Sequence, residues 1–308
     1  MCGPASGVRE MSSMILVTGA TGHVGYHLVE NLADANVLTT AMVRVQAQAD
    51  NLPSGLHHLV ASLDDPPPAD ILRHFDHVFL ISPARQEQVE LEVRFVDALV
   101  LAGHRPHVVK VAADGFQDPD CGVRFMRNHR QIAVHLEATE LPVTYLAANM
   151  YMENLLPAAD TIRREGLLPA PAGDGRVGFV ATSDVADVAA HVLTHEGHQD
   201  RTYVVTGPEA LSYDDVAARI SAVFARTVEY ADVPPYQAKA DMVAAGVDPW
   251  TIDGSLELFE WVRNGAADTV TDEVRKATGE DARPVEDWLR ELRGAFVGHP
   301  EDAPPPQL

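Results

Sequence analysis

Short apolar runs alternate with amphipathic stretches through the first half of the chain. Each run is apolar almost throughout, which predicts strands that are buried on both faces rather than on one. A parallel sheet covered by helices on each side is the arrangement that buries such strands. The predicted strands are residues 14–18, 37–43, 57–61, 77–81, 107–111 and 143–147, and the predicted helices are residues 26–35, 69–75, 86–102 and 125–138.

The second half is less regular. Residues 177–183 lead into a predicted helix at 184–194, residues 202–205 form a strand, and Ser212 is the expected N-cap of a helix that runs to about residue 224. Helical stretches broken by Gly and Pro then continue to residue 297, which predicts a smaller, mainly helical lobe over the carboxyl edge of the sheet. The expected division is a nucleotide-binding domain at 14–155, and a part at 156–298 that completes the sheet edge and forms the substrate lobe. Residues 1–13 and 299–308 are expected to be flexible tails.

The first predicted strand runs directly into three glycines, Gly19, Gly22 and Gly25, spaced GxxGxxG, and then into a helix. In that context Gly19 makes the tight turn, Gly22 admits a diphosphate to the backbone, and Gly25 lets the helix pack closely on the strand. The first helical amides and the positive end of the helix dipole form an anion site. We therefore expect a Rossmann-type, doubly wound α/β fold in which Thr21, His23 and Val24 also contact the dinucleotide. The alternative is a glycine-rich turn with a structural role alone.

Arg44 follows the second predicted strand, and no acidic residue lies between it and Asp50. A carboxylate in this region bonds the adenosine ribose of NAD, whereas a guanidinium suits the 2′-phosphate of NADP. The sequence therefore favours NADP(H) over NAD(H), unless Arg44 is a solvated charge at a strand end.

The remaining strand ends meet the same edge of the sheet, where ligands bind in open parallel sheets. Each of these segments could also be ordinary loop. The expected cofactor neighbours there are Ile81, Ser82, Ala112 and Asn149. The expected substrate neighbours are Pro83, Asp114, Met150, Tyr151 and Met152, with Tyr151 lining the cavity rather than acting in catalysis.

The chain has 308 residues, a formal charge of −22 and two cysteines. This acidity argues against nucleic acid or an anionic membrane surface as a partner. No run approaches the roughly 18 apolar residues of a membrane span, and the N-terminal residues lack a signal-peptide pattern. Two cysteines cannot form a disulfide framework, no spacing of Cys or His indicates a metal site, and a cytoplasmic setting is expected. The oligomeric state is left open.

Several segments, in the right order, resemble the NmrA-like family of atypical short-chain dehydrogenases/reductases. They are ILVTGATGHVG, the stretch from ISPARQEQ to VVKVAADG, LPVTYLAANMYMENLL, FVATSDVADVAAHVLT and TYVVTGPEALSYDDVAARIS, which together span about residues 14–296. The resemblance implies a Rossmann domain, NAD(P) binding and a small C-terminal substrate lobe. Members include quinone, triphenylmethane-dye and isoflavone-type reductases, and regulators that bind the dinucleotide without turning it over.

The chain departs from the Ser, Tyr and Lys of catalytic short-chain dehydrogenases. The helix expected to carry Tyr-x-x-x-Lys has Phe125 and His129 at those positions, and the strand end expected to offer Ser has Ala112 and Ala113. Phe125 has no proton to donate. His129 is a candidate that bonds the nicotinamide ribose or supplies a proton near neutral pH. The alternative for His129 is a partly exposed helix histidine without a role.

These observations favour an NADPH-dependent reductase that transfers hydride to a hydrophobic, conjugated small molecule such as a quinone, aromatic ketone or enone. A delocalised product anion needs little proton assistance, which fits the missing tyrosine. One alternative is a non-catalytic NADP(H)-binding redox sensor, and another is a non-redox tailoring enzyme on the same fold.

Overall fold

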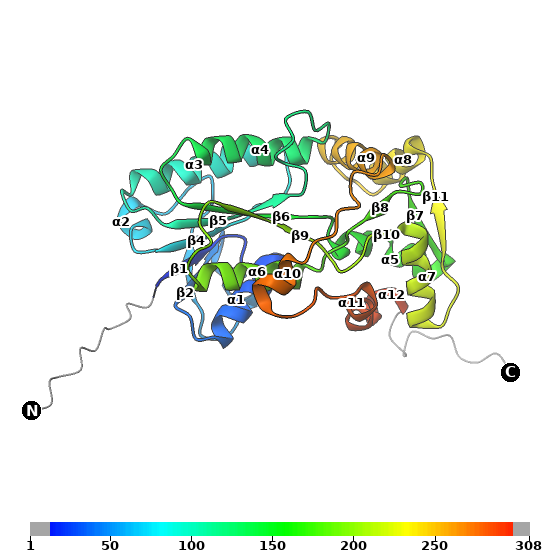
Figure 1. Cartoon of the computed structure of the whole chain (residues 1–308), viewed down its shortest axis with the longest axis horizontal. Helices are drawn as coiled ribbons and strands as arrows, with labels where there is room; N and C mark the ends of the chain where they lie inside the picture. The colour runs from blue at the N-terminus through cyan, green and yellow to red at the C-terminus, as the bar shows by residue number, and fades with distance from the viewer. Residues whose placement is uncertain (1–12, 298–308) are drawn as a thin grey trace, which may run out of the picture.

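Seven parallel strands form one twisted sheet in the computed structural model, which describes residues 13–297 (Figure 1). The predicted tails therefore lie, apart from Ser13, outside the described residues. The strand order is that of a doubly wound Rossmann sheet with one strand added at an edge. In that order the strands are β3 (His57–Val60), β2 (Thr39–Val43), β1 (Ile15–Val17), β4 (His77–Leu80), β5 (His107–Ala113), β6 (Val143–Ala148) and β9 (Arg201–Val205).

Helices cover both faces of the sheet, which confirms the predicted α/β class. Apolar side chains fill the space between the sheet and each helical layer. One layer holds α1 (His23–Asp34), α6 (Thr182–Thr194) and α10 (Glu273–Thr278), and the other holds α2 (Ala69–Leu72), α3 (Gln88–Leu101) and α4 (Arg124–Glu137) (Figure 1).

A smaller lobe lies beyond one end of the sheet and has its own apolar core (Figure 1). It is mainly helical, but it also contains two two-stranded sheets whose strands of two to four residues were too short to predict. Its helices are η2 (Met152–Ala158), α5 (Ala159–Glu165), α7 (Tyr213–Phe224), α8 (Pro235–Ala244), α9 (Pro249–Arg263), α11 (Val285–Glu291) and α12 (Arg293–Val297). Its strands are β7 (Leu167–Ala170), β8 (Arg176–Val177), β10 (Leu211–Ser212) and β11 (Glu229–Asp232), and a short 3-10 helix, η1 (Gln46–Asn51), follows β2.

The predicted elements exist, and the differences are at their ends. Helix α1 begins at His23 rather than Tyr26, because Gly22 already serves as its N-cap. Strand β5 continues to Ala113, since it pairs with β6 over its last residues. Ser212 caps α7 as predicted, and its hydroxyl accepts from the amide of Asp215, whose carboxylate accepts from the amide of Ser212 in return.

The first residue of β5, His107, is buried, and its Nε2 lies 2.7 Å from the hydroxyl of Thr144. That hydroxyl donates to the carbonyl of His198, so Nε2 of His107 must be the donor to it. Nδ1 is buried and has no hydrogen-bond partner within residues 13–297. Burial lowers the pKa of His107 from 6.5 to about 4. The folded state therefore resists protonation of His107.

We predict that the free energy of unfolding falls as pH drops from about 6.5 towards 4. Over this range the unfolded chain binds a proton on His107 and the folded chain does not. This residue contributes at most about 3 kcal/mol to the loss. In urea unfolding at pH 7.0 and 5.0, His107→Gln should reduce the difference in the free energy of unfolding. An undiminished difference would contradict this account.

Candidate functional site

A cavity of about 570 Å³ opens where β1 and β4 lie side by side and the strand order reverses. It runs from the glycine turn past the ends of β2 and β4 to the start of η2. Many of the predicted ligand neighbours line it, namely Gly19, Thr21, Gly22, His23, Val24, Gly25, Arg44, Ile81, Ser82, Pro83 and Tyr151.

The glycine turn at the base of this cavity depends on two residues without side chains. Gly19 has a φ of +59°, and a Cβ on it would lie 2.6 Å from the side chain of Ile81. A Cβ on Gly25 would lie 2.1 Å from the carbonyl oxygen of Gly19. The turn at residues 18–22 can therefore pack the start of α1 closely against the end of β1, with the first helical amides facing the cavity. The first turn of α1 has no acidic residue to compete with an anion.

Thr18, a buried residue that sequence reasoning did not single out, joins the two strands that flank the cavity. Its hydroxyl donates to the carbonyl of Ile81 at 3.0 Å and accepts from the amide of Ile81 at 2.9 Å. The end of β4, with Ser82 and Pro83 after it, is thereby held beside the glycine turn.

Arg44 is exposed at the end of β2 and lines the cavity. The side-chain carbonyl of Gln48 accepts a hydrogen bond from the backbone N–H of Arg44 at 2.8 Å, which fixes the backbone at Arg44. The guanidinium forms no ion pair within residues 13–297, so it is available to an anionic ligand.

The opposite wall is formed by Tyr151, Glu153, Asn154 and Thr182. The Glu153 carboxylate accepts from the hydroxyl of Thr182 at 2.8 Å and from the indole N–H of Trp288 at 3.1 Å. These bonds tie the start of η2 to α6 and α11. Burial raises the pKa of Tyr151, so its phenol stays protonated at neutral pH and contributes shape and polarity to the wall.

Six predicted site residues do not line this cavity: Ala112, Asp114, His129, Asn149, Met150 and Met152. Asn149 is buried, and its side chain accepts the Met150 amide at 2.7 Å and donates to the Ala267 carbonyl at 2.9 Å. Both of its polar groups are thus used inside the fold.

Met150 and Met152 turn into the core of the lobe rather than towards the cavity. Met152 is 1 % exposed, and Met150 packs beside Phe179 and Tyr213 in the same cluster. Burying these apolar side chains in the core is more favourable than leaving them exposed to solvent at the cavity. Asp114 is half-buried at the end of β5, where desolvation raises the pKa of its carboxyl group.

His129 lies next to a buried ion pair that sequence reasoning missed. The Nζ of Lys110 lies 3.3 Å from His129 Nδ1 and 3.0 Å from Glu92 Oε2, and it also donates to the carbonyl of Val111. Oε1 of Glu92 accepts from the hydroxyl of Ser82 at 2.5 Å and from the side-chain amide of Gln88 at 3.3 Å. A continuous chain of polar contacts therefore links Ser82, on the cavity wall, to His129.

His129 keeps some accessible surface, but it is enclosed enough that burial lowers its pKa well below 6.5, and the neighbouring Lys110 lowers it further. The ring is therefore neutral at pH 7 and carries one proton, on one of its two nitrogens. The signal for this cluster was a lysine inside an apolar strand, since a buried charge requires a partner.

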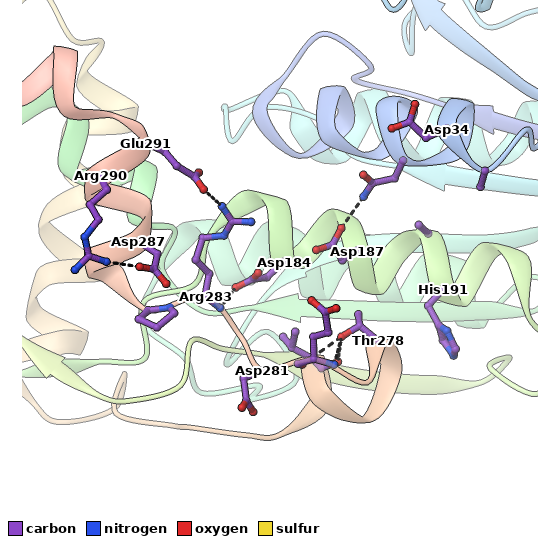
Figure 2. A pocket seen from close by; sticks show the side chains of 16 residues that line it. Asp34, Asp184, Asp187, His191, Thr278, Asp281, Arg283, Asp287, Arg290 and Glu291 are labelled. Atoms are coloured by element: carbon purple, nitrogen blue, oxygen red, sulfur yellow. Dashed lines mark hydrogen bonds and ion pairs between the residues drawn. The ribbon is translucent and has the colours of Figure 1, made fainter.

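A larger hollow, of about 980 Å³, lies at the other end of α1 (Figure 2). Carboxylates gather there from several helices, among them Asp34, Asp187 and Asp287, and Asp184 accepts the Arg283 amide at 2.8 Å. Burial raises the pKa of Asp184 to about 6. This density of negative charge disfavours a diphosphate in that hollow.

Within the described part of the chain, no three or more His, Cys, Asp or Glu side chains are placed to hold a metal ion. No helix among residues 13–297 has the length and apolar character that crossing a membrane requires.

The fold and the glycine-lined cavity define a Rossmann-type dinucleotide-binding protein. Residues 11–289 match the NmrA-like family, and the chain belongs to that family. It is 32 % identical over 287 residues to an NAD(P)H azoreductase of Xenophilus azovorans, with 92 % of this chain and 99 % of that protein covered. It is also 32 % identical over 289 residues to the (4-alkanoyl-5-oxo-2,5-dihydrofuran-3-yl)methyl phosphate reductase of Streptomyces griseus, over 92 % and 99 % of the two chains.

Among solved structures, the chain resembles the NADPH-dependent quinone oxidoreductase QOR2 of Escherichia coli in complex with NADPH. The TM-score is 0.81 at 21 % identity, with 91 % of this chain and all of that chain covered. The triphenylmethane reductase of Citrobacter sp. in complex with NADP(H) gives a TM-score of 0.77 at 23 % identity, over 90 % and 99 % of the two chains. At these identities the likeness concerns the fold.

We predict that Gly25→Ala weakens NADPH binding at least tenfold, because its Cβ would force α1 away from the carbonyl of Gly19. Gly122→Ala is the matched control, since a Cβ there meets nothing within 4 Å. Titration of nicotinamide fluorescence measures both variants. Equal affinity in the two would show that the close join of strand and helix does not form the nucleotide seat.

Proposed function

We propose that the protein is an NADPH-dependent reductase that transfers hydride to a hydrophobic, conjugated small molecule. The observation that carries this proposal is the cavity itself, which joins an anion seat at the glycine turn to a less polar end. That end is bounded by Ile81, Pro83, Leu91 and Tyr151. A dinucleotide spans such a cavity with its diphosphate at the turn and its nicotinamide beyond Ser82.

The residues present fit this cofactor. Gly19 and Gly25 leave room that side chains would fill, and no carboxylate occupies the first turn of α1. The unpaired Arg44 guanidinium supports NADP(H) over NAD(H), because it matches a 2′-phosphate in charge and hydrogen-bonding geometry. An acidic residue in its place would instead repel that phosphate.

When bound, NADPH supplies the hydride. The chain's own contribution is to seat the diphosphate, to hold the cofactor between Ile81 and Tyr151, and to align an acceptor against it; such alignment removes much of the entropic barrier to a reaction between two bound molecules. Phe125, at the position of the usual tyrosine, has no hydroxyl. Its ring packs against Trp250, with centroids 5.3 Å apart, and against Gly254.

This lack of a phenolic acid supports acceptors whose reduced form is stabilised by delocalisation, such as quinones. The named activities of relatives agree in class: one reduces azo compounds, one acts on a furanone phosphate, and a protein of the same fold is a quinone oxidoreductase. A plain aliphatic ketone develops a localised alkoxide, so we expect it to be a poor acceptor.

Phe125 also supports a second candidate, a dinucleotide sensor without turnover. A protein of the same fold, solved in complex with NADP, is the negative transcriptional regulator NMRA. That chain is 16 % identical, with a TM-score of 0.74 over 91 % of this chain and 95 % of its own.

The two candidates are separated by an assay of the purified protein with NADPH and a panel of quinones, azo dyes and aliphatic ketones. The reductase predicts loss of absorbance at the nicotinamide band with the conjugated acceptors, and little with the ketones. Tight NADPH binding without turnover of any acceptor would refute the reductase and support the sensor.

We predict that Arg44→Asp weakens NADPH binding roughly tenfold, about 1.4 kcal/mol, and strengthens NADH binding. Arg73→Asp, an exposed charge at the end of α2, is the control for net charge. Calorimetric titration with both nucleotides measures the preference. If the ratio of the NADPH and NADH affinities is the same in both variants, Arg44 does not bind the 2′-phosphate.

A further inference from the structure

Lys110 and Glu92 are buried, with side-chain exposures of 1 % and 0 %, and nothing in the proposed function uses them. Burying two charges is costly even when they are paired, and an apolar pair of similar size often serves stability as well. The pair also lies at a defined place, on β5 and α3, between Ser82 on the cavity wall and His129 on α4. These facts point to a role in the site.

The contacts of Lys110 determine its protonation state. Nζ lies 3.0 Å from Glu92 Oε2 and 3.3 Å from His129 Nδ1, and it donates to the Val111 carbonyl. A neutral amine would leave the Glu92 charge buried without a counter-charge, which costs far more than a buried ion pair. Lys110 is therefore an ammonium.

The contacts of Glu92 match a negative charge. The Ser82 hydroxyl and the Gln88 side-chain amide donate to Oε1. Oε2 accepts no hydrogen bond from the described residues, and the ammonium 3.0 Å away balances its charge. The pair therefore fixes an ammonium beside the imidazole of His129.

An ammonium cannot accept a hydrogen bond, so Nδ1 of His129 must present its lone pair to Lys110. In a neutral imidazole the proton then resides on Nε2. That nitrogen has no hydrogen-bond partner among residues 13–297, and the ring keeps accessible surface. The adjacent Asn128 donates to the Arg85 carbonyl at 3.2 Å, which holds this turn of α4 against the loop that follows Ser82.

We propose that Lys110, held by Glu92, is a positioning residue that fixes His129 as a neutral donor with its proton on Nε2. Resting on the proposed reductase, this narrows the substrate class to acceptors that carry an oxygen or nitrogen on which negative charge gathers as hydride arrives. His129 then stabilises that charge by a hydrogen bond, and the final proton comes from water. A quinone oxygen or azo nitrogen satisfies this requirement. A cationic triphenylmethane dye, which gains no negative charge on reduction, does not need it.

The tautomer can be measured in the free protein by 15N-edited NMR of the histidine rings at pH 7.5, with the His129 signals assigned by their loss in His129→Gln. The expected result is an unprotonated Nδ1 and a protonated Nε2. A proton on Nδ1, or an even mixture of tautomers, would overturn the proposal. This measurement requires no turnover, so its result does not depend on whether the protein is a reductase.

Removing the ammonium alone would leave the Glu92 charge buried, so the test uses the double variant Lys110→Met with Glu92→Gln, which removes both charges. The fixed tautomer should be lost in this variant, while the signals of His135, an exposed histidine paired with Asp97 on the same face of the sheet, stay unchanged. A His129 tautomer that persists would overturn the positioning role.

Steady-state kinetics adds a readout that a merely structural role would not move. The double variant and His129→Ala should each lower kcat about tenfold for a neutral quinone, with less than a twofold change in kcat for a cationic triphenylmethane dye. The matched control removes an exposed pair, Lys239→Met with Asp253→Asn, and should leave both unchanged. An equal fall for both acceptors, or none, would overturn the proposal. Absence of turnover in the unmodified protein would instead refute the reductase.

Discussion

The contact between Gly25 and the carbonyl of Gly19 is the constraint on which the site depends. It lets the tight turn at residues 18–22 bring the start of α1 against the end of β1, and so directs the first helical amides at the point where the strand order reverses. Thr18 fixes the neighbouring strand β4 to the same turn through two hydrogen bonds. The anion seat and the strand end at Ser82 take their positions from this join.

A second constraint lies in strand β5, which carries the buried charge of Lys110. The ammonium of Lys110 can remain buried because a carboxylate, a carbonyl and an imidazole surround it. Burying these charges lowers stability, and the apolar core around them offsets that loss. The cluster connects the cavity wall to α4 through fixed hydrogen bonds. Geometry and electrostatics at the site therefore come from separate parts of the sheet, the glycine turn at β1 and the charged centre of β5.

Local patterns were enough to predict the strands, the helices on both faces and the glycine turn, because apolar periodicity and glycine spacing express short-range constraints. Arg44 and Ser82 were predicted at the cavity for the same reason, since a residue that directly follows a parallel strand reaches the ligand edge. The orientation of side chains a few residues beyond a strand end was harder to predict from the sequence. Met150 and Met152 turn inward because the lobe offers them an apolar core, and Asn149 is used by the distant carbonyl of Ala267. Ala267 lies 118 residues from Asn149 in the sequence, and the core partners of the two methionines come from several separate segments. The pairing of Lys110 with Glu92 also depends on how α3 packs on β5, although an isolated lysine in an apolar strand already indicates that a partner exists.

The central claim is that the amides at the start of α1 seat a diphosphate and that the cavity carries the nicotinamide towards Tyr151. A crystal structure of the protein grown with saturating NADPH tests it most directly. The account predicts diphosphate oxygens on the amides of the first turn of α1, the 2′-phosphate beside Arg44 and the nicotinamide between Ile81 and Tyr151. A nucleotide bound elsewhere, or an empty glycine turn at saturating NADPH, would contradict it.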